Sequence, residues 1–330
     1  MSSGHGAKVL LSIAMAALFP AQALYGAAQL PSGEMPPAQA PAAPSGLDAD
    51  HAERVQRAVD AHDYGTAEKL LLDEINSDPH SRRAAKLLAW LGSIYMLDRD
   101  AMSAAVAWNK SNAIVPLDSK LQFSLAMAYV AMKRPDWARR QLEKLAADEP
   151  KNALYPYWLG RLDYDGHLYP SAVRRFQQAI ALDPKLARAY DNLGLVYYYQ
   201  NQNALAVENF RKAIELERNL AHPSAWPYLN LAITEQFLNQ PADAEAHLRE
   251  AIRLDAGLPQ AHFQLGTALE DSGKLEEAAA ELQEAARLDP AYPEPHMALA
   301  RLYHKLGREL DAREEVKIYR QLHSQPSPQK

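Results

Sequence analysis

The apolar positions of the chain recur with a period of 34 residues from residue 85 onward. Each period holds a large apolar residue followed by a small one, an alanine twelve residues later and a large residue four positions beyond. The first four units carry Leu91-Gly92, Leu125-Ala126, Leu159-Gly160 and Leu193-Gly194, then Ala104, Ala138, Ala172 and Ala206, then Trp108, Leu142, Phe176 and Phe210. Apolar residues at helical spacing, interrupted by short polar turns such as residues 271–274, predict two helices in every unit.

Further units extend the pattern in both directions. A four-residue insertion near residues 222–225 precedes three more units, and residues 48–81 form a degraded unit upstream. The later units carry Leu231-Ala232, Leu265-Gly266 and Leu299-Ala300, and the degraded one carries Ala67, Leu71 and Pro79. The chain therefore has about eight units, and the insertion predicts either a longer turn or a hinge.

The repeated residue types have a packing explanation. A small residue at the eighth position of a unit lets the second helix cross the first helix closely. The alanine at the twentieth position is the matching small surface on the second helix. The large residue at the twenty-fourth position fills the core between units. Pro116, Pro150 and Pro184 stand where the second helix must end, because proline cannot continue a helix.

This pattern resembles the tetratricopeptide repeat family over residues 47–323. The unit at 187–220 has the family's residues at their positions, namely Tyr190, Leu193, Gly194, Tyr197, Ala206, Phe210 and Ala213. The resemblance implies an all-α, right-handed superhelical solenoid whose first helices line a concave groove. Three residues depart from the pattern and predict locally looser packing: Asp163 replaces a tyrosine, and Ser111 and Tyr319 replace alanines.

The N-terminal 28 residues have the pattern of an export signal. Lys8 precedes an apolar run from Val9 to Phe19, and Ala21-Gln22-Ala23 offers a small-x-small cleavage site. The segment is interpreted as a signal peptide or, if it is retained, as a membrane anchor. Residues 29–46, with five prolines, predict a linker, and residues 324–330 a disordered tail.

Composition and motifs argue against several functional classes. The chain has no cysteine, which excludes disulfides, thiolate metal sites and a cysteine nucleophile. Its net charge of −6 does not favour nucleic-acid binding. The 11 histidines show no metal-ligand spacing, and Asp163-Tyr164-Asp165 is interpreted as a chance DxD match within a helix. No enzyme activity, metal site or cofactor is expected.

The resemblance also indicates which first-helix residues would face a ligand. The predicted peptide-binding residues are Tyr157, Arg161, Tyr164, Arg188, Asn192, Tyr198, Asn230 and Phe237. The two asparagines would either grip a ligand backbone or be ordinary family residues. The two arginines would either bind a carboxylate or be neutralised by Asp165 and Asp191. The aromatic residues would either meet a ligand, as tyrosine does at many interfaces, or pack on the neighbouring helix.

These observations predict a non-catalytic scaffold that binds a peptide or a partner helix in its groove. In a bacterium the chain would be exported to the periplasm or secreted, and would assemble an envelope or secretion complex. Contact with a membrane is expected only if the N-terminal segment is retained. Two alternatives stay open: a self-associating module that forms a homo-oligomer, and a solenoid that binds a small ligand or glycan.

Overall fold

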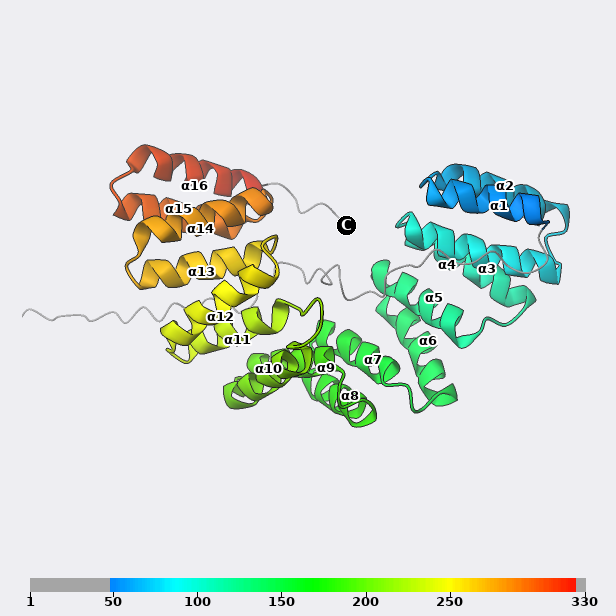
Figure 1. Ribbon diagram of the computed structural model, residues 1–330, viewed down its shortest axis with the longest axis horizontal. Coiled ribbons are helices and arrows are strands. Elements are labelled where there is room, and N and C mark those ends of the chain that lie inside the picture. The colour runs from blue at the N-terminus through cyan, green and yellow to red at the C-terminus, as the bar shows by residue number, and fades with distance from the viewer. Residues whose placement is uncertain (1–47, 325–330) are drawn as a thin grey trace, which may run out of the picture. The chain divides into compact units, whose positions relative to one another are not determined.

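A computed structural model describes residues 48–324, which form 16 helices and no strand. The helices are α1 (Ala49–Asp60), α2 (Tyr64–Ser77), α3 (Arg82–Leu97), α4 (Ala101–Ile114), α5 (Ser119–Ala131), α6 (Pro135–Asp148), α7 (Leu154–Asp165), α8 (Tyr169–Leu182), α9 (Ala187–Tyr199), α10 (Asn203–Glu217), α11 (Trp226–Phe237), α12 (Pro241–Leu254), α13 (Pro259–Asp271), α14 (Leu275–Leu288), α15 (Pro293–Lys305) and α16 (Glu309–Ser324). They form eight consecutive helix-turn-helix units (Figure 1). The predicted all-α repeat solenoid is confirmed. The predicted signal peptide or anchor (1–28), the linker (29–46) and all but the first residue of the tail lie outside the described residues.

Each helix packs against the helix before it and the helix after it. In addition, first helices of successive units contact one another: α7 touches α9, α9 touches α11, α11 touches α13 and α13 touches α15. The first helices therefore form a shared surface along the repeats, which we call the first-helix surface. It is the part of the fold on which the predicted site residues lie.

Local chemistry explains where the helices begin. Asp63, Ser81, Asp100 and Asp118 each accept a hydrogen bond from a backbone N–H in the first turn of the helix that follows. Other helices instead carry proline in the first turn, where the missing N–H needs no partner.

The turn between the two helices of a unit has the same backbone conformation throughout. Its residue at the fifteenth position has positive φ in all eight units, and only two of these residues are glycine. They are His62, Arg99, Lys133, His167, Asn201, Asn239, Gly273 and Gly307. Residues with a Cβ rarely adopt this left-handed conformation, so the packing of the helices on either side must hold it in place.

Two predicted weak points are in fact compensated. Ser111, which replaces a small apolar residue, is buried, and its hydroxyl donates to the Ala85 carbonyl at 2.8 Å. Asp163, which replaces a tyrosine, is also buried, and it accepts from Arg139 on α6 at 2.6 Å and from Ser171 on α8 at 2.6 Å. Both residues thus make hydrogen bonds that tie neighbouring helices together.

The insertion before α11 is accommodated as a longer turn. Residues 218–225 join α10 to α11, and the Ser224 N–H donates to the Glu217 carboxylate at 2.7 Å. Burial raises the pKa of this glutamate. Leu231 on α11 still packs on Ala206 and Phe210 of α10. The stacking of helices therefore continues across the insertion.

The last two units share a histidine–glutamate pair between their first and second helices. His262 on α13 contacts Glu281 on α14 at 2.7 Å, and His296 on α15 contacts Glu315 on α16 at 2.6 Å. The two histidines are 34 residues apart, and so are the two glutamates. The pair is therefore a repeated feature of the C-terminal units.

The His262 pair predicts a pH-dependent stability. The hydrogen bond that His262 donates to Glu281 raises the pKa of His262, with smaller contributions from the Ala256 carbonyl and from Glu284, while burial opposes them. A histidine whose pKa is raised on folding stabilises the fold fully below its unfolded pKa of about 6.5. We expect this contribution to be lost as the pH rises through the folded pKa. The free energy of unfolding, measured with urea at several values between about pH 5.5 and about pH 8.5, should show the decline.

The matching variant is His262→Gln, which should flatten that decline because glutamine does not titrate. His304→Gln is the control, since His304 is an exposed histidine on α15 that pairs with Glu309. A stability profile of His262→Gln that falls as steeply as that of the unaltered chain would contradict the assignment.

Candidate partner-binding surface

Five aromatic rings form a continuous cluster on and beside the first-helix surface. Its members, which we call the aromatic strip, are Tyr164 of α7, Tyr169 of α8, Tyr198 and Tyr199 of α9, and Phe237 of α11. Tyr169 and Tyr199 are stacked, with centroids 5.9 Å apart and planes 8° apart. Tyr164 lies 5.8 Å from Tyr199. Tyr198 lies 5.7 Å from Tyr199 and 6.4 Å from Phe237.

The strip is positioned by the ends of helices. Tyr199 and Phe237 are the last residues of α9 and α11, and Tyr164 is the last but one of α7. Tyr169 is the first residue of α8 and follows the left-handed turn residue His167, whose Nδ1 lies 3.1 Å from the Tyr169 hydroxyl. The C-terminal ends of the first helices of three successive units thus contribute rings to one cluster.

Exposure distinguishes the strip from the core. The four tyrosines are half-buried, whereas Phe237 is 63% exposed. Leu168, which precedes Tyr169, is 54% exposed, and Leu238, which follows Phe237, is 40% exposed. Exposed apolar side chains grouped with aromatic rings are typical of interaction surfaces rather than of inert ones.

The phenols of Tyr198 and Tyr199 remain protonated at physiological pH. Burial raises the pKa of Tyr198 and of Tyr199 above the ordinary value. Each hydroxyl therefore keeps its proton and can donate a hydrogen bond.

Beside the strip, four of the predicted site residues form a network inside the protein. Arg161 donates to the Asn192 side-chain oxygen at 2.7 Å, and the Asn192 amide donates to the Arg188 carbonyl at 2.8 Å. The Arg188 guanidinium lies over the Tyr157 ring, 4.8 Å from its centroid. Tyr157, Arg161 and Asn192 are all buried. Their contacts join α7 to α9.

A second polar pair joins α9 to α11. The Asn230 amide donates to Asp191 at 2.9 Å, and both side chains are buried. Asp165 lies 3.9 Å from the Arg161 guanidinium, at the limit of an ion pair. Of the two acids named as neutralising partners, Asp165 thus meets Arg161, and Asp191 binds the asparagine of the next unit.

The structure therefore divides the predicted site residues into two groups. Tyr164, Tyr198 and Phe237 belong to the accessible strip, and Arg188 is half-buried beside it. The buried group has internal contacts and supports the surface from below; it consists of Tyr157, Arg161, Asn192 and Asn230. An asparagine grip on a ligand backbone stays a prediction, and it would require these internal bonds to open.

Two residues of the strip were absent from the predicted set. Tyr199 occupies a ligand-facing position of the repeat register, but the predicted set took only its neighbour Tyr198 from this end of the helix. Tyr169 lies on the second helix of its unit, outside that register, and joins the cluster only through tertiary packing.

The C-terminal part of the first-helix surface is charged. Glu270 on α13, almost fully buried, accepts from Arg301 at 2.7 Å and from Lys305 at 2.5 Å, both on α15. These two cations thus hold an internal carboxylate.

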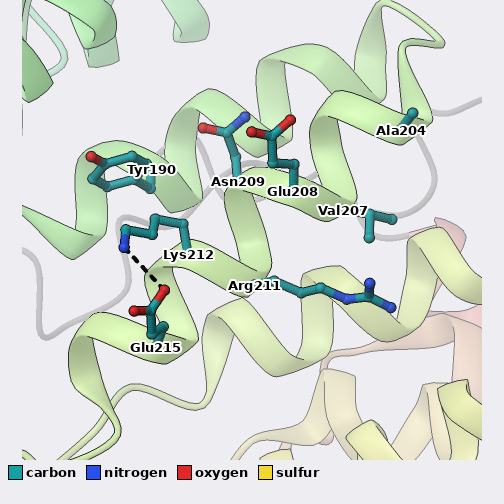
Figure 2. Close-up of a pocket in the computed structure, with 8 residues that line it drawn as sticks. All are labelled: Tyr190, Ala204, Val207, Glu208, Asn209, Arg211, Lys212 and Glu215. Carbon is teal, nitrogen blue, oxygen red and sulfur yellow. Dashed lines mark hydrogen bonds and ion pairs between the residues drawn. The ribbon is translucent and has the colours of Figure 1, made fainter.

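An open depression of about 580 Å³ is lined by residues of α10 together with Tyr190 of α9. Figure 2 shows its charged side chains, among which Lys212 and Glu215 form an ion pair at 3.0 Å.

Among residues 48–324, no cluster of three or more potential ligands could hold a metal ion. No helix in the same range has both the length and the apolar character needed to cross a membrane.

Comparisons with known proteins agree with the repeat pattern. The profile described as tetratricopeptide repeat matches residues 185–256, and one described as TPR repeat matches residues 160–201 and 267–307. The type IV pilus assembly protein PilF of Pseudomonas aeruginosa is 29% identical over 131 residues, which are 39% of this chain and 52% of PilF. The chain thus spans about half the length of this relative.

Solved structures share the fold. A tetratricopeptide repeat protein from Parabacteroides merdae superposes with a TM-score of 0.62 at 16% identity, covering 82% of this chain and 97% of that one. PilW, a type IV pilus biogenesis factor, superposes with a TM-score of 0.56 at 21% identity, covering 63% and 94%. Repeats of this kind mediate protein–protein interactions and are generally not catalytic. The helix pairs, the recurring residues and these profile matches show that the chain contains tetratricopeptide repeats.

Proposed function

We propose that this chain is a non-catalytic scaffold that binds a segment of a partner protein on the aromatic strip. The observation that carries the proposal is the continuity of five rings across three units, ending on the exposed Phe237. Aromatic residues supply most of the binding energy at protein interfaces, because they bury a large area at a small cost in side-chain entropy. The buried network beneath would keep α7, α9 and α11 in register for binding.

The setting we propose is the assembly of a complex in a bacterial envelope. Support comes from the similarity to a type IV pilus assembly protein and from the fold shared with a pilus biogenesis factor. The pattern of an export signal in residues 1–28 agrees with the same compartment.

The double variant Tyr198→Ala/Phe237→Ala tests the proposal. We expect it to weaken partner binding by about 2 kcal/mol or more, because two neighbouring rings of the surface are removed. The measurement is capture of envelope proteins by the full chain, quantified by mass spectrometry beside the variant. Circular dichroism should show unchanged helix content, since Tyr198 is half-buried and Phe237 is exposed.

The matched control is Trp137→Ala, which removes a ring that is 47% exposed on α6, away from the strip. Partners that bind the control and are lost from the double variant support the strip. Partners retained by both variants contradict it. A chain that captures no protein but changes its mass with concentration would favour self-association instead.

A further inference from the structure

The aromatic strip lies in three successive units that share an unusual charge pattern. In every unit, the last turns of the first helix, the short turn and the first turns of the second helix form what we call the turn-side segment. In the units of the strip these segments are residues 162–173, 196–207 and 234–245, and they contain no lysine or arginine. The segments of the other five units each contain between one and three of these residues; they are 57–68, 94–105, 128–139, 268–279 and 302–313. Basic side chains are thus missing from this side of the fold only where the rings lie.

We infer that the strip binds a basic segment of a partner protein, whose lysine or arginine side chains lie over the rings and beside Asp165. This inference rests on the proposed function, since it names the chemical class of the partner. Three features support it, namely an incompletely compensated carboxylate, the ring faces and the ends of the first helices.

The turn-side segments of the strip contain five acidic residues, of which two are accessible to a ligand. Asp163 and Glu235 are buried and contact basic side chains of second helices. Glu245 accepts a hydrogen bond from a lysine of the next unit at 2.9 Å. The Asp165 side chain is 41% exposed, and Asp243 is exposed in the first turn of α12. A basic ligand would therefore meet acids near both ends of the strip.

Asp165 is the acid that adjoins the rings. It follows Tyr164 at the end of α7, and its described ion pair with Arg161 spans 3.9 Å. The Arg161 side chain is buried and donates to Asn192 at 2.7 Å, so it compensates the carboxylate only in part. Burial raises the pKa of Asp165, against the opposing effects of Arg161 and His167. A cation from a ligand would stabilise the charged form of this carboxylate.

The rings add a second attraction for cations. The face of an aromatic ring is electron-rich, and lysine or arginine side chains bind over it. The chain itself contains such contacts, since the Arg188 guanidinium lies 4.8 Å from the centroid of Tyr157 and that of Arg134 lies 5.5 Å from the centroid of Trp137. Phe237, which is 63% exposed, offers a ring to a ligand in the same way.

The helix ends beside the strip favour the same sign of charge. Tyr199 and Phe237 end α9 and α11, and Tyr164 is the last residue but one of α7. The C-terminal end of a helix carries a partial negative charge, which stabilises a nearby cation. Arg188 does not take this place, because it lies ten residues before Tyr198 on α9. That separation is about 15 Å along a helix.

Other classes of segment fit these charges less well. An acidic segment would be repelled by Asp165 and Asp243, and the turn-side segments of the strip have no lysine or arginine to receive it. A neutral segment would stack on the rings but would cover the Asp165 carboxylate without compensating its charge, which costs free energy.

The test is binding of a fluorescently labelled glycine–serine peptide that contains three arginines to the full chain, followed by anisotropy. Two control peptides carry glutamines or glutamates in place of the arginines. We expect the arginine peptide to bind at least about tenfold more tightly than the glutamine peptide, and its affinity to fall as salt is added. Equal affinity for these two peptides, or tightest binding of the glutamate peptide, overturns the inference.

Asp165→Asn should weaken binding of the arginine peptide about fivefold, because it removes the charge beside the rings and keeps the size of the side chain. The matched control is Asp136→Asn, which removes the same charge from an exposed residue in the first turn of α6 and should change the affinity by less than about twofold. Urea unfolding of both variants checks that the fold persists. An equal loss in the two variants would mean that the peptide responds only to the net charge of the chain, and it would overturn the inference.

Phe237→Leu tests the contribution of a ring. Leucine keeps an exposed apolar side chain but has no aromatic face, so the arginine peptide should bind about threefold more weakly. The control is Trp137→Leu, because Trp137 is an exposed ring on α6 that Arg134 already covers, and the affinity should not change. Unchanged affinity of Phe237→Leu, or an equal loss in Trp137→Leu, would contradict binding on the strip.

The inference and the proposed function can fail separately. If envelope partners depend on Tyr198 and Phe237 but the arginine peptide neither binds nor competes with them, the basic class is wrong and the strip remains the interface. If the arginine peptide binds in an Asp165-dependent way while captured partners ignore the strip, the ligand class stands and the proposed scaffold site is wrong.

Discussion

Arg139→Met is expected to destabilise the chain by about 3 kcal/mol. Arg139 donates to Asp163 at 2.6 Å, and the Asp163 side chain is only 2% exposed. Removing the guanidinium leaves a buried carboxylate with Ser171 as its remaining donor from the described contacts. We place the effect at the lower end for a broken buried pair, because Arg139 is 28% exposed and water can reach its place.

The complementary change should be much milder. In the double variant Arg139→Met/Asp163→Leu both charges are gone and an apolar side chain of similar size fills the site, so most of the lost stability should return. Arg140→Met, which alters the neighbouring exposed arginine, is the control. Urea unfolding followed by circular dichroism measures all four chains. A double variant no more stable than Arg139→Met would show that the carboxylate is not the source of the cost.

A similar carboxylate lies two units further on. Glu235 occupies the same repeat position as Asp163, is fully buried, and contacts His247 at 2.6 Å and Arg211 at 3.7 Å. In both units an acidic residue thus replaces the usual aromatic ring, and basic or hydroxyl side chains from second helices contact it. The sequence identified Asp163 as a departure from the repeat. Its partners could not be identified, because they come from positions that are polar in half or more of the units.

The repeat period was sufficient to predict the helix pairs and the core. A period of 34 with small and large residues at set positions leaves few ways to pack two helices, and the observed units follow it. The left-handed turn residue was harder to recognise. Gly273 and Gly307 mark it most clearly in the sequence, while residues such as Arg99 and Lys133 adopt the same φ because tertiary packing holds them there.

Side-chain burial limited the prediction of the site. A repeat register indicates which way a helix position points, but not whether a neighbouring unit covers it. Tyr157 and Phe237 both occupy ligand-facing positions, yet the first is fully buried under Arg188 and the second is 63% exposed. Tyr169 illustrates the opposite case, because it joins the strip from a helix that the register assigns to the other side.

The small residue at the eighth position shows where sequence and packing agree in detail. Glycine stands there where the twenty-fourth residue is aromatic, and alanine stands there in three units where that residue is aliphatic. The glycine pairs are Gly92–Trp108, Gly160–Phe176 and Gly194–Phe210, and the alanine pairs are Ala126–Leu142, Ala232–Leu248 and Ala300–Val316. Gly266 faces Leu282 instead, and a Cβ there would lie 2.7 Å from the Leu282 side chain.

Phe210→Ala is therefore expected to cost about 4 kcal/mol, because the ring is fully buried between α9, α10 and α11 and leaves a cavity. Gly194→Ala should also destabilise, by about 1–2 kcal/mol, since its Cβ would lie 2.6 Å from the Phe210 ring. In the Phe210→Ala background, Gly194→Ala should stabilise the chain instead of destabilising it. The added methyl then enters the cavity, and alanine stabilises the middle of α9 relative to glycine by about 1 kcal/mol.

The cycle of these two variants measures that reversal. Urea unfolding of the four chains gives the coupling between the positions, and we expect about 2 to 3 kcal/mol. Leu205→Ala, which shortens a side chain that is 41% exposed on α10, is the control and should change stability by less than about 0.5 kcal/mol. Additive effects of Gly194→Ala and Phe210→Ala would mean that α9 and α10 move apart to relieve the contact. Backbone flexibility, rather than the close crossing of the two helices, would then explain the glycine.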